Sequence, residues 1–313
     1  MNDKQKTIKN AVSVKGSGLH TGQNGILTFR PAPENHGIKF KRIDLEGQPI
    51  IEANIDHVIS TDRGTTIGNN GAKVFTIEHV LAALTGLGVD NVLIELDMEE
   101  IPIQDGSAKY FVEALLEAGI IDQNAEKDYI VITEPISFEI PEKRVKLLLE
   151  PADHFSACVV INFETKVLGE QVARLQRMED FPKEIAPCRT FVFLHELEFL
   201  LKNNLVKGGD LNNAIVFMNR RVSQDELDRL AELFNKPKVK VKPEGVLNNL
   251  DLYFENEPAR HKLLDIIGDL ALLGRPIKGH ITAYRPGHQS NTEFAKIIKK
   301  KLNNISDVKK TTV

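Results

Sequence analysis

One pattern occurs twice in this chain: a helix with a histidine near its start, then a leucine-glycine turn, then an apolar strand. The first copy spans residues 78–94 and carries His79, and the second spans residues 260–283 and carries His261. The two copies share few identities, and the second helix is the longer one. The repeat indicates two similarly built domains, because each copy is one supersecondary unit with the same order of parts. It also predicts that the N-terminal ends of these two helices, each with a histidine, could lie together where the two halves of the chain join.

Short segments of alternating apolar and polar residues, separated by glycines, predict a sheet in each half. The polar residues 122–128 interrupt this alternation and place a domain boundary near Glu126. We expect an α+β protein of two domains with similar topology, each a mainly antiparallel sheet layered against helices. The expected ranges are an N-terminal domain at 1–126, a C-terminal domain at 127–302 and a polar, lysine-rich tail or linker at 303–313. Residues 191–217 predict a strand-helix-strand insertion in the second domain.

Composition excludes several classes of protein. No apolar run approaches the roughly 20 residues that cross a bilayer, and the polar start of the chain lacks a secretory signal, so we expect a cytoplasmic protein without a transmembrane segment. The net charge of -4 gives no reason to expect nucleic acid as a partner. With 2 cysteines, which are not closely spaced, the chain cannot form a zinc knuckle, so histidine, aspartate or glutamate must hold any metal.

His261 and Asp265 are four residues apart on one expected helix, which places both side chains on the same face. Zinc favours imidazole and carboxylate ligands, and a catalytic site uses three protein ligands with one open position. His79 is the best candidate for the third ligand, because Glu78 beside it could act as a general base. Asp269 extends the polar stripe of the helix by one further turn. Since the opposite helix face is apolar, the stripe is expected to line a wet cleft.

Taken one at a time, these signals are weak. A His and an Asp at helical spacing more often form a surface pair than a metal site, and a Glu-His dipeptide is weaker still. His288 follows an expected strand in a turn, where an exposed histidine is the ordinary finding. The glycine-rich residues 17–22 could approach a phosphate but lack the strand and helix of a phosphate-binding loop, which leaves His20 without a role on chemistry alone.

Four motifs taken together are far more specific. They are Ser-Gly-Leu-His-Thr-Gly at 17–22, Thr-Ile-Glu-His-Val-Leu-Ala-Ala-Leu at 76–84, Arg-His-Lys-Leu-Leu-Asp-Ile-Ile-Gly-Asp at 260–269, and Gly-His at 287–288. In this order the chain resembles the UDP-3-O-acyl-N-acetylglucosamine deacetylases of lipid A synthesis, from about residue 7 to residue 302. The resemblance implies two domains, each a sheet layered against helices, with zinc at the bottom of the cleft between them.

The resemblance also implies roles for individual residues. Zn²⁺ would be held by His79, His261 and Asp265, although Fe²⁺ also fits such ligands. The implied catalytic residues are the general base Glu78, the helper histidine His288, the carboxylate Asp269 that orients it, the hydroxyl of Thr190 beside the metal, and the cation of Lys262 near the substrate. In the insertion, Phe191 would contact the sugar, and an apolar wall for the fatty chain would be formed by Phe193, Leu197, Leu200, Leu201 and Leu205.

The expected reaction is metal-assisted hydrolysis of the substrate's acetamide. Zinc would polarise the acetyl carbonyl and lower the pKa of its water towards ~7, while Glu78 removes a proton from the attacking water. Zinc and the Thr190 hydroxyl would stabilise the oxyanion. Either His288 or Glu78 could then protonate the departing amine. We favour His288, because pairing with Asp269 keeps an imidazolium protonated near neutral pH.

The expected partner is a UDP-linked, acylated glucosamine. Some relatives carry a fused 3-hydroxyacyl carrier-protein dehydratase, and such a domain could follow Val313 in a longer protein. Two alternatives stay open: a non-catalytic protein that binds sugar nucleotides or lipids, and a zinc amidase for another acetylated sugar. Removing the fatty chain from the substrate would distinguish the enzymes, because only the lipid enzyme would lose much activity.

Overall fold

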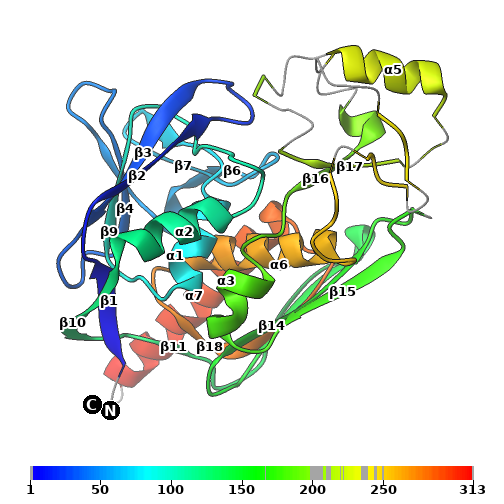
Figure 1. The fold of residues 1–313 in the computed structure, drawn as a ribbon. Coiled ribbons are helices and arrows are strands. Elements are labelled where there is room, and N and C mark those ends of the chain that lie inside the picture. Colours follow the sequence, from blue (N-terminus) through cyan, green and yellow to red (C-terminus); the bar gives the residue numbers. More distant parts are fainter. Residues whose placement is uncertain are drawn as a thin grey trace.

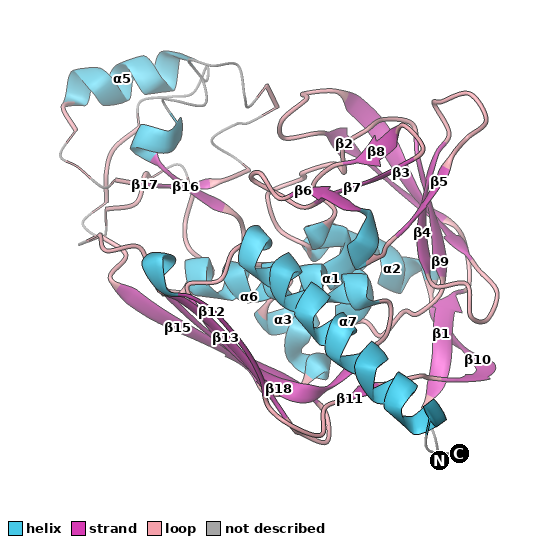
Figure 2. Ribbon diagram, turned by 180° about the vertical axis from the view of Figure 1, so that it is seen from behind, coloured by secondary structure: helices cyan, strands magenta, loops and turns pink. Residues whose placement is uncertain are grey.

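The computed structural model describes residues 3–165, 167–197, 207–208, 213–218, 220, 222–233, 239–242, 245–248 and 250–311. Two sheets, in which antiparallel pairs predominate, enclose a central layer of helices (Figure 1; Figure 2). This arrangement confirms the predicted α+β class. Among the helices of the described ranges, none combines the length and the apolar character needed to cross a membrane.

The first large sheet has the strand order β2-β3-β9-β4-β5. All its neighbours are antiparallel except β4 and β9, which are parallel. Helix α1 (Glu78–Gly86) precedes its central strand, and α2 (Lys109–Ala118) follows it. The strands are β2 (Val12–Ser17), β3 (Asn24–Pro31), β4 (Ile38–Arg42), β5 (Ile50–Glu52) and β9 (Val92–Leu96).

The second large sheet has the order β12-β13-β18-β14-β15, with β11 (Ile130–Val131) also paired to β18. Helix α6 (Glu257–Leu270) precedes its central strand, and α7 (His288–Thr311) follows it. The strands are β12 (Ile136–Ile140), β13 (Val145–Glu150), β14 (Phe155–Asn162), β15 (Glu170–Leu175) and β18 (Ile277–Tyr284).

The two large sheets have the same topology. When β11 is left aside, the fifth strand in sequence lies in the centre of each sheet, antiparallel to the second and parallel to the third. The helix-turn-strand pattern seen twice in the sequence is therefore α1 to β9 and α6 to β18, and the predicted repeat is confirmed. Strands of the two sheets fall within residues 12–96 and 130–284, while the domain boundary near Glu126 stays a prediction.

Several segments differ from the expectation. The polar residues around 122 form β10 (Ile120–Glu126), which pairs with β1 (Lys4–Ile8). Because most side chains of β10 are exposed, its sequence lacks the alternation that marks a half-buried strand. The glycine-rich stretch after Ser60 contributes to a small sheet of β6 (Val58–Ser60), β7 (Thr66–Asn69) and β8 (Ala72–Val74).

The predicted tail at 303–313 is wrong for residues 303–311, which continue α7. Backbone hydrogen bonds propagate a helix from a packed segment without a further apolar face. A polar, lysine-rich composition is thus compatible with helix as well as with coil.

The insertion contains β16 (Phe191–Phe193) and a parallel partner, β17 (Ile215–Phe217), with a helical turn at residues 194–197 between them. Three of the five expected wall residues lie outside the described residues: Leu200, Leu201 and Leu205. The shorter elements of the chain are α3 (Phe181–Glu184), α5 (Gln224–Leu233), and the 3-10 helices η1 (Ile55–His57), η2 (Pro141–Lys143), η3 (Met178–Asp180) and η4 (Ala271–Leu273).

Helices α1 and α6 pack against each other in the central layer (Figure 2). Their approach depends on Gly268, because a Cβ atom at this position would lie 2.0 Å from the carbonyl oxygen of Glu78. No side chain fits in that space. The glycine therefore allows the start of α1 to lie directly on α6.

Gly268→Ala should lower the free energy of unfolding by about 1–3 kcal/mol, the usual effect of overpacking a core. Thermal or urea unfolding measures this loss. Gly287→Ala is the matched control, since an added Cβ there meets nothing within 4 Å, and it should leave stability nearly unchanged. Equal stability of the two variants would contradict the close-packing argument.

Candidate active site

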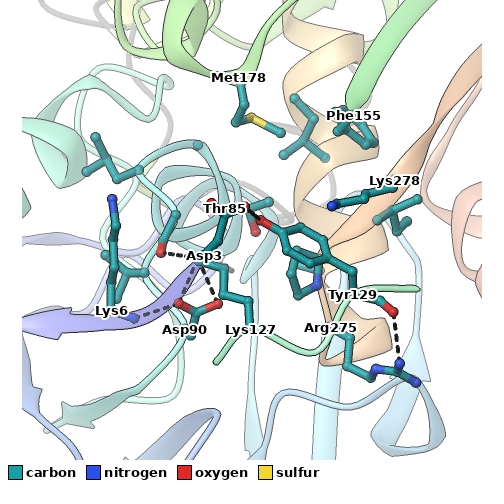
Figure 3. A pocket seen from close by; sticks show the side chains of 18 of the residues that line it. Asp3, Lys6, Thr85, Asp90, Lys127, Tyr129, Phe155, Met178, Arg275 and Lys278 are labelled. Atoms are coloured by element: carbon teal, nitrogen blue, oxygen red, sulfur yellow. Dashed lines mark hydrogen bonds and ion pairs between the residues drawn. The ribbon is translucent and has the colours of Figure 1, made fainter. Parts of the chain in front are cut away.

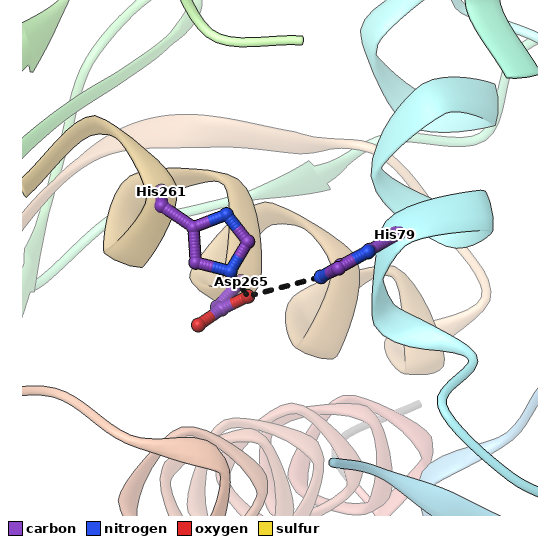
Figure 4. Close-up of side chains that lie close together, drawn as sticks. All are labelled: His79, His261 and Asp265. Carbon is purple, nitrogen blue, oxygen red and sulfur yellow. Dashed lines mark ion pairs between the residues drawn. The ribbon is translucent and has the colours of Figure 1, made fainter. Parts of the chain in front are cut away.

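Three side chains that can bind a metal meet between the two domains. His79 is the second residue of α1, and His261 and Asp265 lie one turn apart on α6 (Figure 4). The Oδ1 atom of Asp265 is 3.9 Å from Nε2 of His79 and 3.4 Å from Nε2 of His261. One ligand atom from each residue lies within 4.8 Å of the other two. The N-terminal parts of α1 and α6, which carry the two histidines, therefore lie together where the two halves of the chain join.

The donor set fits a divalent metal ion. Asp265 is 1% exposed, and its Oδ1 atom has no hydrogen-bond partner within the described part of the chain. A buried carboxylate oxygen left without a partner is costly unless a cation binds it. Nδ1 of His261 lies 3.0 Å from the carbonyl oxygen of Cys188 and donates to it, which leaves Nε2 free to act as a ligand. Two imidazoles and one carboxylate are ligands that zinc favours.

The electrostatics keep these groups in their metal-binding forms. Burial, together with the nearby His261, lowers the pKa of His79 to about 3, and burial also lowers the pKa of His261. Burial alone would raise the pKa of Asp265, but the Lys262 ammonium, 2.8 Å from its Oδ2, and the surrounding imidazoles hold it well below its usual range. At neutral pH the site therefore offers two neutral imidazoles and one carboxylate.

Glu78 is suited to act as a base beside this cluster. Its Oε2 atom accepts a hydrogen bond of 2.9 Å from the backbone N–H of Thr65, which fixes the carboxyl group. Burial raises the pKa of Glu78 to about 7, and the nearby carboxylates of Asp269 and Asp265 add to this effect. A carboxyl group with a pKa near neutrality can both take up and release a proton at working pH.

His288, at the start of α7, faces the same space. Its Nδ1 atom donates to Oδ2 of Asp269 at 3.0 Å, and its Nε2 atom lies 3.9 Å from Oε1 of Glu78 and 3.9 Å from Oδ2 of Asp265. Burial opposes protonation, but the carboxylates of Asp269 and Glu78 raise the pKa of His288 to about 10. His288 is therefore an imidazolium at neutral pH, with its Nε2–H near Glu78 and Asp265.

Asp269 does not line the cleft that the helical stripe predicted. It is fully buried and binds three side chains: Oδ1 accepts from the hydroxyl of Thr65 at 2.5 Å, and Oδ2 accepts from Asn291 at 2.8 Å and from His288. Neither Thr65 nor Asn291 was indicated by the sequence. No local pattern could have found them, because Thr65 and Asp269 are 204 residues apart in the chain.

A cavity of about 700 Å³ opens beside the cluster formed by His79, His261 and Asp265. Its polar lining includes Glu78, His288, Thr190 and Lys262, so the cavity brings together the catalytic residues expected from the sequence except Asp269. The apolar side includes the expected Phe191, Phe193 and Leu197, as well as Phe163, Val192 and Val216, which the sequence did not indicate.

The aromatic residues form one packed group at this cavity. The ring of Phe163 lies 5.5 Å from the rings of both Phe191 and Phe193, measured between centroids. The Lys262 ammonium is 5.7 Å from the Phe191 ring. The cavity therefore has a positively charged group, the Lys262 ammonium, next to an apolar surface. Such a combination suits an amphipathic ligand.

The loop with the first sequence motif also reaches the cavity, through Leu19 and His20. The buried carboxylate of Glu100 holds this loop: it accepts from the backbone N–H of His20 at 2.9 Å and of Thr21 at 2.8 Å. The sequence left His20 without a role, and only the fold places it at the same cavity as Glu78 and His288.

Comparison with known proteins adds to this geometry. The chain matches a family described as UDP-3-O-acyl N-acetylglycosamine deacetylase over residues 5–239 and 235–300. It is 47% identical over 299 residues to a protein of Bacteroides thetaiotaomicron named bifunctional enzyme LpxC/FabZ, which covers 96% of this chain and 65% of that protein. It is 40% identical over 293 residues to the UDP-3-O-acyl-N-acetylglucosamine deacetylase of Myxococcus xanthus, which covers 93% of this chain and 85% of the relative.

A further bifunctional LpxC/FabZ enzyme, from Porphyromonas gingivalis, is also 47% identical over 299 residues, or 96% of this chain. The chain spans 65% of the length of each of the two bifunctional relatives, which is less than two thirds.

Proposed function

Because the chain belongs to the UDP-3-O-acyl N-acetylglycosamine deacetylase family, we propose that it hydrolyses the acetamide of UDP-3-O-(3-hydroxyacyl)-N-acetylglucosamine. The products are the free amine and acetate, and the step belongs to lipid A biosynthesis in the cytoplasm. The observation that carries this proposal is the meeting of a buried His79, His261 and Asp265 cluster with Glu78 and His288 in one cavity.

We assign His79, His261 and Asp265 as the ligands of one Zn²⁺ ion. Such an ion, when bound, supplies Lewis-acid polarisation of the acetyl carbonyl and acidifies water. Fe²⁺ suits the same donors and is the alternative metal. The hydrogen bond from His261 to the Cys188 carbonyl keeps this ligand in the required tautomer.

Glu78 takes a proton from water as the water oxygen attacks the acetyl carbon. The oxyanion that forms is stabilised by the imidazolium of His288 and by the hydroxyl of Thr190 at the cavity wall. The C–N bond then breaks, and the amine nitrogen receives the Nε2 proton of His288. His288 is better placed than Glu78 to donate this proton, because it is protonated at neutral pH and Asp269 orients its ring.

The remainder of the cavity accounts for substrate selection. Lys262 provides positive charge for the substrate, and Phe191 contacts the sugar. The fatty chain lies along the apolar wall, to which Phe193 and Leu197 contribute. A zinc amidase for another sugar would not need this wall, and a non-catalytic binding protein would not need the paired base and acid. The names of the bifunctional relatives support a fused 3-hydroxyacyl carrier-protein dehydratase after Val313.

The proposal is tested by metal content and by hydrolysis of the UDP-linked acylated substrate. We expect about one metal ion per chain, loss of that metal in His79→Ala, and recovery of activity when zinc is returned to chelated parent protein. His57→Ala, which changes a histidine away from the cavity, should keep both metal and activity. A metal-loaded parent that fails to release acetate from this substrate would contradict the proposal. Equal turnover of a substrate without the fatty chain would instead favour the other amidase.

The pH profile of kcat/KM should be bell-shaped. Glu78 must be deprotonated to act as a base, so activity rises with pH through its pKa, about 7 in the chain alone. His288 must be protonated to act as an acid, so activity falls as pH rises through its pKa, about 10. A bound divalent cation lowers both values, which places the limbs at or below these pH values. His288→Gln should remove the descending limb, and a descending limb that survives in this variant would assign it to another group.

A further inference from the structure

A second cavity, of about 740 Å³, lies between the domains at the far ends of α1 and α6 (Figure 3). Residues 85–89 at the end of α1 and residues 267–274 around the end of α6 form part of its wall. Thr85 is roughly 9 Å along the helix from His79, at 1.5 Å per residue. Among the described residues, the two cavities share no lining side chain.

Part of the surface of this cavity is apolar and comes from both domains, while charged side chains line much of the rest. The side chains that form the apolar part include Val89, Phe155, Met178, Leu270 and Ile277. Val89, Leu270 and Ile277 are buried. Phe155 and Met178 are half-buried, and Figure 3 shows both of them. Interdomain cavities of this size, with an apolar lining and a few polar groups, are the usual form of small-molecule sites.

Several charged groups at the cavity already have partners. The Lys127 ammonium lies 2.8 Å from the carboxylate of Asp90 and donates to the carbonyl oxygen of Gly88 at 2.8 Å, which compensates the negative end of α1. Arg275 pairs with the carboxylate of Asp128 at 2.6 Å. These groups are therefore satisfied within the protein.

Two ammonium groups are not satisfied in this way. Lys6 on β1 and Lys278 on β18 are half-buried, and neither has a carboxylate within ion-pair distance in the described part of the chain. Lys278 lies 4.3 Å from the ring centroid of Tyr129, a contact that leaves its charge uncompensated. Asp122 and Asp153, which also line the cavity, are exposed and stay hydrated. The unmet charge of the partly buried surface is thus positive.

We propose that this cavity is a binding site for a small amphipathic anion, an acyl chain or aromatic ring that bears one carboxylate, phosphate or sulfonate group. The apolar part packs against the side chains from both domains, and the anionic group compensates the charge of Lys278, while Lys6 lies on the other side of the cavity (Figure 3) and adds positive charge at longer range. A metal cation fits poorly, because the carboxylates here are either paired with cations or exposed. The site is separate from the proposed catalytic centre and does not depend on the proposed reaction.

The test is a fluorescence titration of the metal-loaded full chain with 8-anilinonaphthalene-1-sulfonate, which combines aromatic rings with a sulfonate. Lys278→Met should weaken binding about tenfold, since a charge-assisted contact contributes about 1.5–3 kcal/mol and each 1.4 kcal/mol is tenfold. Lys6→Met, which removes the more distant cation, should weaken binding less. Ala271→Trp, which fills one end of the cavity without changing a charge, should also reduce binding. Displacement of the probe by dodecanoate or by dodecyl phosphate then shows which anionic group the site prefers.

Two matched variants keep the result interpretable. Lys262→Met removes a cation from the catalytic cavity, and Lys146→Met removes an exposed cation on β13, so both should bind the probe as the parent does. Binding that is lost in Lys262→Met but kept in Lys278→Met would assign the probe to the catalytic cavity and overturn the proposal. Equal binding by all variants would overturn it as well. Thermal unfolding confirms that each variant is folded.

Discussion

Glu78→Gln is expected to lower kcat/KM by about 10²–10⁴-fold while the chain keeps its metal, which is the usual contribution of a general base. Glutamine retains an oxygen that can accept the hydrogen bond from the Thr65 N–H, so the side chain should stay in place. It cannot take up a proton. The variant therefore separates proton transfer from metal binding, because His79, His261 and Asp265 are unchanged.

The measurements are steady-state kinetics with the UDP-linked substrate and metal analysis of the same samples. Glu113→Gln is the control, since this exposed residue on α2 is far from the cavity and should behave like the parent. Activity within a few-fold of the parent would remove Glu78 from the mechanism. Loss of the metal together with activity would instead show that Glu78 supports the metal site.

Arg189→Met is expected to lower the free energy of unfolding by about 3–5 kcal/mol, because it leaves a buried carboxylate without its cation. Arg189 and Glu257 are 4% and 0% exposed. The guanidinium donates to Glu257 through Nε at 2.8 Å and through its second amino nitrogen at 3.1 Å, and the Arg189 backbone N–H donates to the same carboxylate at 3.0 Å. The Tyr253 N–H, at 2.8 Å, completes its partners.

The same variant should weaken metal binding. Arg189 follows Cys188, whose carbonyl oxygen orients His261, and Glu257 lies one turn before His261 on α6. Urea unfolding of the metal-free chain and chelator competition of the loaded chain measure the two effects separately. Arg189→Met/Glu257→Gln should recover much of the lost stability, because no buried charge remains and the glutamine oxygen can still accept a backbone N–H hydrogen bond. If the double variant is as unstable as the sum of both single variants, the ion pair is not the cause.

Some of this molecule could be predicted from the sequence because the relevant signals are local. The spacing of His261 and Asp265 places both on one face of a helix, whatever surrounds that helix. Alternation along β3 or β18 reflects one buried face and depends only on neighbouring residues. The repeat of the helix-turn-strand pattern was likewise visible before the shared sheet topology was known.

Other features were decided by the tertiary structure. Thr65 reaches Asp269 across 204 residues, and the loop with His20 is held by Glu100 from a distant part of the chain. The polar strand β10 and the helical residues 303–311 lack an apolar pattern that a sequence could reveal.

The sequence by itself determined the kinds of side chain available and which neighbours share a face, because helix and strand periods act over a few residues. The raised pKa values of Glu78 and His288 and the second cavity arise only when both domains are packed. Desolvation and charge proximity depend on atoms from distant segments, so these properties are set by the folded chain as a whole.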